Sequence, residues 1–269
     1  MSHVIRKYVL IALFLCLLAG TAHAQLFLEE GKVVLPVSGG EHVNKSFTLH
    51  NTSSKELEVR VYLEDFQYEP PYDGTKSFVP AGTGKASISK WISFRPQIFK
   101  IPSLGTQKIE YSISVPENAQ GGYYGVIFFE TMDDPLKNKE GVSVVTRVGG
   151  LLFIESKDKI KKATLENIEL TNHLISGHFI NQGNTVLIPR MTYNIMDKEG
   201  LVLDRGELKK IYVPPGASAE WNVLIPKNLK VKNCSMVINT DLEEGIIVVK
   251  ELELVKDAAG HFSIANIRD

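Results

Sequence analysis

The sequence predicts an all-β protein, and three observations support that fold class. Apolar side chains alternate in short runs such as Ile109, Tyr111 and Ile113, which is the period of a strand with one buried face. Turn residues recur roughly every 8–12 positions, as expected of short strands joined by tight connections. No stretch shows the period of a long amphipathic helix. Such an architecture favours binding or scaffolding over catalysis.

The first 24 residues have the organisation of a secretory signal peptide. Arg6 and Lys7 form a positive region, residues 9–18 form an apolar region, and Ala22-His23-Ala24 has the small residues of a cleavage site. The apolar run is short for a membrane span, so we expect cleavage after Ala24; a retained N-terminal anchor is the alternative. The sequence therefore predicts an exported protein, either periplasmic or extracellular.

The composition of the mature chain limits the classes of partner. Removing 24 of the 269 residues leaves 245, which is enough for two domains of ordinary size. Cleavage removes two of the 30 basic residues and none of the 31 acidic ones, so the mature net charge is −3. This near balance predicts no nucleic-acid partner. No second apolar run has the length of a membrane helix, so we expect no membrane anchor after cleavage.

Residues 25–155 are predicted to form the first sandwich. The stretch from Asp65 to Ser89 is rich in Pro, Gly, Lys and Ser, and this composition predicts a mobile surface loop. Strands are predicted at 33–37, 47–52 and 57–63, in three runs between 91 and 130, and at 142–148 and 151–154. This number of short alternating strands is typical of an immunoglobulin-like sandwich.

Residues 156–255 repeat the same pattern and are predicted to form a second immunoglobulin-like sandwich. Its turns include Asn181-Gln182-Gly183-Asn184 and Asp197-Lys198-Glu199-Gly200. Residues 256–269 are predicted to be a poorly ordered tail. The strands are predicted at 165–170, 174–180, 191–196, 201–203, 211–213, 219–225, 235–239 and 246–254.

Few residues are candidates for catalysis or metal binding. Cys234 is the only cysteine after cleavage, and its strand-like surroundings favour a small buried hydrophobe over a nucleophile. His173 and His178 are five residues apart, which places them on opposite faces of a regular strand. The chain has no phosphate loop, nucleophile elbow or zinc-protease motif. The sequence therefore predicts a protein that is not an enzyme, with no catalytic residues, no cofactor and no metal.

Two features are candidates for binding a protein partner. A sandwich has edge strands whose unpaired backbone groups can accept a partner strand. The predicted loop also carries four aromatic side chains, Phe66, Tyr68, Tyr72 and Phe78, which are contact anchors if they are exposed. The alternative is that these rings fold back and cover the open end of the sandwich. Trp91 and Trp221 lie in alternating strands and are predicted to be core residues.

The first sandwich resembles the N-terminal domain of periplasmic pilus-assembly chaperones, and most of the mature chain resembles secreted proteins related to the WxL-interacting cell-surface family. The first resemblance rests on residues 47–52 (FTLHNT), Trp91 and residues 96–102 (PQIFKIP). The second rests on residues 115–129, in which Val115-Pro116, Ala119 and Gly121 come before an aromatic strand-like run. It also rests on the turns at 181–184 and 197–200.

These resemblances imply an exported, non-enzymatic protein-binding module of the bacterial envelope that acts as a chaperone-like or accessory component for surface structures. The implied partner is a pilin-like or surface-layer subunit. The alternative is a surface adhesion or cell-wall-polymer-binding protein. Pilus chaperones hold the C-terminal carboxylate of their client with a first-strand arginine and a lysine near the cleft between the domains. Here residues 32–37 contain no arginine, and Lys100 and Lys108 are the nearest candidates for the lysine. The WxL-interacting proteins normally carry a C-terminal membrane anchor, and from this sequence we expect none.

Overall fold

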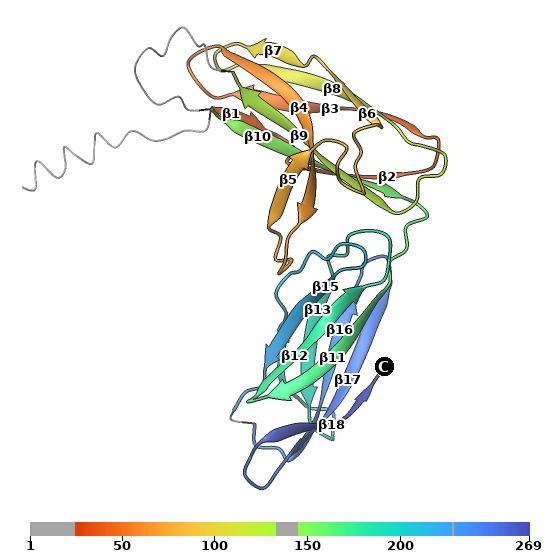
Figure 1. The fold of residues 1–269 in the computed structure, drawn as a ribbon. Coiled ribbons are helices and arrows are strands. Elements are labelled where there is room, and N and C mark those ends of the chain that lie inside the picture. The colour runs from red at the N-terminus through yellow and green to blue at the C-terminus, as the bar shows by residue number, and fades with distance from the viewer. Residues whose placement is uncertain (1–24, 133–144, 228) are drawn as a thin grey trace, which may run out of the picture.

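The computed structural model describes residues 25–132, 145–227 and 229–269, and it confirms the predicted all-β class (Figure 1). The predicted signal peptide lies outside the described residues. Two β-sandwiches follow one another along the chain, and each surrounds a hydrophobic core of its own. No helix among the described residues is long and apolar enough to cross a membrane.

The first sandwich packs two sheets against each other. One sheet has the strand order β1-β3-β8-β6, with bounds Leu26–Leu28, His42–Asn51, Thr106–Ser114 and Ile92–Arg95. The other has the order β2-β10-β9-β4-β5, with bounds Lys32–Val37, Arg147–Ser156, Gly122–Thr131, Leu57–Tyr68 and Lys76–Pro80; β7 (Ile98–Ile101) also pairs with β4. The chain thus changes sheets between β1 and β2, and β2 pairs with β10 in parallel.

Alternation places the core of the first sandwich as the sequence predicts. Phe47 on β3 lies opposite Ile109 on β8, and both side chains are fully buried between the sheets. Phe129 on β9 approaches Phe47 from the other sheet, with ring centroids 5.8 Å apart. Strand residues that are two apart share a face, so one set of side chains forms this core and the other set points outward.

The second sandwich has a three-stranded and a five-stranded sheet. The smaller sheet has the order β11-β12-β15, with bounds Ala163–Thr171, Leu174–Asn181 and Ser218–Leu224. The larger has the order β14-β13-β16-β17-β18, with bounds Val202–Glu207, Arg190–Met196, Asn233–Asp241, Ile247–Lys256 and Phe262–Arg268. Trp221 and Cys234 are buried in its core, as predicted. Trp91 in the first sandwich is only half-buried and packs on Tyr123, with ring centroids 4.1 Å apart.

The predicted mobile loop between Asp65 and Ser89 is wrong. β4 continues to Tyr68, and β5 returns beside it in a regular antiparallel register. The segment that follows β5 is held by Asp65 of β4. The Asp65 carboxylate accepts hydrogen bonds from the backbone N–H groups of Gly82 and Gly84, each at 2.9 Å, and from the Ser87 hydroxyl at 2.7 Å. Pro and Gly mark the turns of this segment, while strand pairing and a buried carboxylate hold it in place.

The predicted tail after residue 255 is also wrong. Residues 262–268 form β18, which extends the larger sheet by pairing with β17. Phe262 and Ile264 pack against the core of the second sandwich, although one irregularity interrupts the register between Glu253 and Leu254. In the first sandwich, β10 is a single strand through Gly149 and Gly150, where the sequence predicts two runs; residues 142–144 of the first run lie outside the described residues.

Candidate partner-binding site between the two sandwiches

Three of the four aromatic residues singled out in the sequence gather on the outer face of the β2-β10-β9-β4-β5 sheet. Phe66 and Tyr68 are neighbours on one face of β4 and are only 8% and 6% exposed. They pack with residues of β9 and β10 in a cluster that we call the aromatic cluster, and Tyr72 from the β4–β5 turn packs against it. Its buried members are Phe66, Tyr68, Tyr124, Val126, Phe128 and Phe153.

Phe78 differs from these residues because it remains 41% exposed on β5. Its ring meets Phe128 edge-on, with centroids 5.1 Å apart. Of the four predicted anchors, Phe78 alone therefore has a largely accessible ring. Direct partner contact by any of the four stays a prediction.

The aromatic cluster joins the first sandwich to the second. The rings of Tyr68 and Tyr212 stack with centroids 5.1 Å apart and planes inclined by 22°. The Tyr212 N–H donates to the carbonyl oxygen of Tyr72 at 2.8 Å. Figure 1 shows the hairpin of β4 and β5 extending from the first sandwich toward the second. The rings thus fold back, but they cover the outer face of a sheet and not the open end of the sandwich.

Tyr124 makes the second connection between the sandwiches. Its hydroxyl oxygen accepts a hydrogen bond from the Val186 N–H at 2.6 Å and is hydrogen-bonded to the Thr185 hydroxyl at 3.0 Å. Burial raises the pKa of both Tyr124 and Tyr68, so the two phenols stay neutral well above neutral pH. This side of the first sandwich is therefore an aromatic surface with little buried charge.

Three lysines lie over the rings at this junction. The Lys32 ammonium is 4.5 Å from the ring centroid of Phe153, and the Lys76 ammonium is 4.8 Å from that of Tyr68. The Lys210 ammonium of the second sandwich is 5.5 Å from the ring centroid of Tyr212. None of the three lysines forms an ion pair with any residue in the described parts of the chain. Cation–π contacts of this kind hold an ammonium group while leaving its outer side open to an anion.

Burial and the nearby Lys32 lower the pKa of Lys76. Two ammonium groups are thus held close enough to repel each other, and a bound carboxylate would relieve that repulsion. No local pattern in the sequence groups these lysines, because they come from β2, β5 and a loop of the second sandwich. The sequence offers Lys100 and Lys108 as candidates, but neither packs against the aromatic cluster. Lys100 lies on β7 and forms an ion pair with Glu56 at 3.2 Å, and Lys108 lies exposed on β8.

A free strand edge begins beside Lys32. β10 pairs with β9 from Arg147 to Glu155, but with β2 only from Leu151 onward. On the β2 side, the Leu151 N–H donates a hydrogen bond to the carbonyl oxygen of Gly31. Backbone groups alternate between the two edges of a strand, so those of Arg147 and Gly149 point to the same side as Leu151 and pair with no strand among the described residues. This edge is open to an added strand.

Comparison with known proteins supports the fold but finds no related sequence. No protein-family model matches the chain, and no curated protein matches it. Solved structures do match, and they place the fold in the class seen in fimbrial chaperones.

Two of these structures have TM-scores of 0.52. One is a chain from a chaperone–tip adhesin complex described as vital for synergistic activation of CFA/I fimbriae biogenesis; it is 15% identical, and the match covers 84% of this chain and 97% of that one. The other is the class 5 fimbriae chaperone CfaA, which is 13% identical, with 83% and 97% covered. At this identity the likeness shows a shared fold. The predicted relation to the WxL-interacting family stays a prediction.

Proposed function

We propose that this protein is an exported, non-enzymatic, chaperone-like accessory protein that binds a subunit of a bacterial surface structure. The observation that carries the proposal is the edge of β10 that no described residue pairs with; it ends beside Lys32 and Lys76, neither of which forms an ion pair with a described residue. The shared fold with fimbrial chaperones supports the same conclusion. The location that follows is the periplasm or the cell exterior.

An added strand at this edge has a defined end point. A partner segment that pairs with Arg147 and Gly149 lies in line with β2, which occupies the same edge of β10 from Leu151 onward. The partner segment must therefore stop where β2 begins, at Lys32. If it runs parallel to β10, its C-terminus is the end that meets this lysine.

The lysines provide the charge to hold that C-terminus. A terminal carboxylate at the start of β2 would meet Lys32 and Lys76, and the pKa of Lys76 is already lowered by burial and by the nearby Lys32. In this arrangement Lys32 takes the place of the first-strand arginine that the resemblance to pilus chaperones implies. Charge-assisted hydrogen bonds to a carboxylate are among the stronger contacts available at a half-exposed site.

The test is capture of the partner from envelope extract by the mature chain, residues 25–269. We compare the unchanged protein with the double variant Lys32→Met/Lys76→Met and with the matched control Lys100→Met. The proposal expects an exported surface subunit to be captured by the unchanged protein and the control. The double variant is expected to capture it about tenfold less well, because two charge-assisted contacts are lost.

A second measurement identifies the group that the lysines bind. Removing the last residues of the captured subunit is expected to weaken its capture by the unchanged protein and to have little further effect on the double variant. Equal capture by all three proteins would contradict the carboxylate site. Capture of no surface subunit, or retention of the protein on isolated cell wall, would contradict the chaperone-like function and favour the adhesion alternative.

A further inference from the structure

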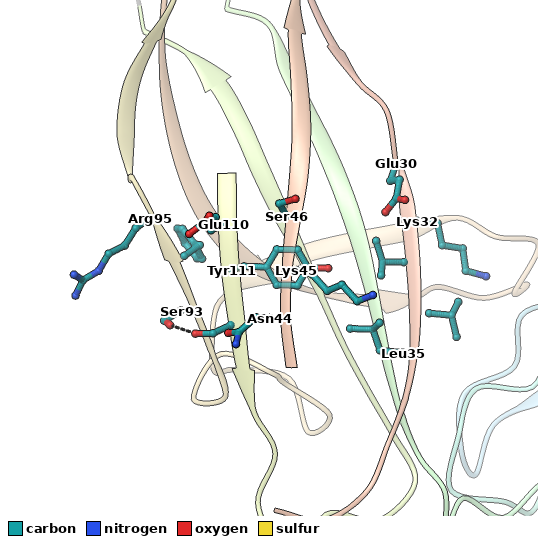
Figure 2. A pocket seen from close by; sticks show the side chains of 14 residues that line it. Glu30, Lys32, Leu35, Asn44, Lys45, Ser46, Ser93, Arg95, Glu110 and Tyr111 are labelled. Carbon is teal, nitrogen blue, oxygen red and sulfur yellow. Dashed lines mark hydrogen bonds between the residues drawn. The ribbon is translucent and has the colours of Figure 1, made fainter. Parts of the chain in front are cut away.

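A second strand edge, that of β3, is left open where the chain changes sheets between β1 and β2. β1 pairs with β3 only at residues 49–51, and β2 then joins the opposite sheet. The part of β3 from His42 to Phe47 therefore has no paired neighbour on its β2 side among the described residues. A groove of about 1200 Å³ occupies this gap, and Figure 2 shows it between β2 on one side and β3, β8 and β6 on the other.

Backbone groups are free along the wall of the groove. The carbonyl oxygen of Thr48 accepts a hydrogen bond from Glu29, so even-numbered residues of β3 direct their backbone groups to this side. The N–H and C=O groups of Asn44 and Ser46 consequently face the groove, and no strand in the described part of the chain pairs with them. An extended chain can satisfy them by adding to β3.

The interior of the groove carries two polar groups at positions that normally face a core. Lys45 and Tyr111 lie opposite each other on β3 and β8, on the same face as the buried Phe47. In Figure 2 the Lys45 amine and the Tyr111 hydroxyl both point toward β2. Lys45 is exposed, and it forms no ion pair with a described residue.

Tyr111 is the more unusual of the two. Its side chain is only 3% exposed and stacks on Phe47 with ring centroids 5.0 Å apart. Its hydroxyl makes no hydrogen bond to any residue in the described parts of the chain. Burial, with the nearby Glu30 carboxylate, raises the pKa of Tyr111 to about 12. The hydroxyl therefore keeps its proton at neutral pH and is available as a donor.

From this arrangement we infer that the groove binds an extended peptide segment that carries one acidic side chain. The segment adds to β3 at Asn44 and Ser46, and its Asp or Glu carboxylate meets the ammonium of Lys45 and the hydroxyl of Tyr111. Side chains two residues before and after the acidic one enter the same interior, where Val33 and Leu35 of β2 line the groove. Apolar residues fit these two positions.

The charges of the groove limit the partner to a single carboxylate. Besides Lys45, the groove is lined by two carboxylates, Glu30 and Glu110, and by two further cations, Lys32 and Arg95. Its charges nearly balance, so a single carboxylate is favoured over a strongly acidic segment. Lys32 belongs to the β2 wall of the groove, but in Figure 2 its side chain points away from Lys45, and its ammonium lies over Phe153 on the outer face. The Lys45 site is therefore distinct from the lysine site at the junction of the sandwiches. An inward-pointing lysine is also a known protection of a strand edge against pairing, and that role predicts no peptide binding at all.

The test uses the mature chain and a blocked peptide, acetyl-Thr-Val-Thr-Asp-Thr-Val-Thr-amide, together with the same peptide carrying Asn in place of Asp. Binding is followed by titration of the backbone amide signals of Asn44 and Ser46 and by their protection from hydrogen exchange. The proposal expects the Asp peptide to shift and protect both amides and to bind about fivefold more tightly than the Asn peptide, as for a half-exposed ion pair.

Three variants separate the proposal from its alternatives. Lys45→Met and Tyr111→Phe are each expected to abolish the preference for Asp over Asn, and both keep the bulk of the side chain. Lys108→Met, which removes an exposed lysine from the outer face of the same sheet, is expected to keep the preference. The proposal is overturned if neither peptide protects Asn44 and Ser46, or if the preference for Asp survives in Lys45→Met. Unchanged binding in Lys76→Met, which alters the site at the junction but not the lining of the groove, distinguishes this site from the one proposed above.

Discussion

Tyr124 illustrates how a single side chain joins two sandwiches. It lies on β9 of the first sandwich, and its ring is 6% exposed within the aromatic cluster. Its hydroxyl reaches the second sandwich, where it is hydrogen-bonded to the Val186 N–H and to the buried Thr185 hydroxyl. Both groups lie where water has little access, so the phenol oxygen is their main hydrogen-bonding partner.

Tyr124→Phe is expected to lower the free energy of unfolding by about 1–3 kcal/mol, because it leaves a shielded N–H and a buried hydroxyl without their partner. Urea denaturation at neutral pH measures the change. Tyr123→Phe is the matched control: its ring packs on Trp91, and its hydroxyl makes no hydrogen bond to a described residue. Equal stability of the two variants would show that the hydroxyl of Tyr124 contributes nothing to the junction.

At the level of single strands, β18 has a clear structural role. It covers one edge of β17, which would otherwise end the larger sheet of the second sandwich. Its residues alternate in burial: Phe262 and Ile264 are half-buried against the core, whereas Ser263 and Ala265 are exposed. The Lys256 ammonium lies 4.8 Å from the ring centroid of Phe262 and adds to the attachment.

Ile264→Ala is expected to destabilise the protein by about 1–2 kcal/mol, since a half-buried isoleucine loses part of the contact area of a core residue. Ile267→Ala serves as the control, because Ile267 is 40% exposed in the same strand. Thermal unfolding of both variants tests the difference. A poorly ordered tail predicts no effect from either change, so equal midpoints would contradict the attachment of β18.

Across the whole molecule, a charged linker complements the aromatic cluster in joining the sandwiches. Lys159 pairs with Glu155 at 3.0 Å and with Glu244 at 2.8 Å. Lys161 pairs with Glu243 at 3.0 Å and with Glu244 at 3.4 Å. The two lysine side chains are only 12% and 6% exposed, so the linker lies closely against the β16–β17 turn. The hydrogen bond from Lys159 is the largest cause of the lowered pKa of Glu244.

Glu244→Gln removes the carboxylate that both lysines share and is expected to cost about 1 kcal/mol or less at neutral pH, as for a largely exposed pair. A lowered pKa in the folded state means that the stabilisation is present above the usual pKa of 4.5 and is lost as the pH falls below it. In urea denaturation, the stability difference from the unchanged protein should therefore shrink as the pH falls from about 6 to about 3. Glu199→Gln, which alters an exposed hairpin glutamate without an ion pair among the described residues, is the control. A difference that is independent of pH would contradict the ionic origin of the effect.

Much of the fold follows from local patterns, whereas the candidate site does not. The alternation of Ile109, Tyr111 and Ile113 predicts a strand because burial on one face of a sheet is recorded in neighbouring residues. The sequence predicts a loop at β5 and a tail at β18, because Pro, Gly and polar residues are common in turns and tails alike. The four aromatic residues can be named from the sequence, and their role in partner binding stays a prediction. The burial of Tyr68 involves Tyr212, which lies far away in the sequence.

Two tandem sandwiches with separate cores are thus determined by the sequence alone, since the period of two and the spacing of turns act over a few residues at a time. The tertiary structure alone decides which strand edges remain open and which charges meet. Within residues 25–132 and 145–269, apart from residue 228, the pairing of β2 with β10 and not with β3 leaves one edge free beside Lys32 and another beside Lys45. Long-range pairing is set by the balance of the whole sheet, and no local pattern in the chain specifies it.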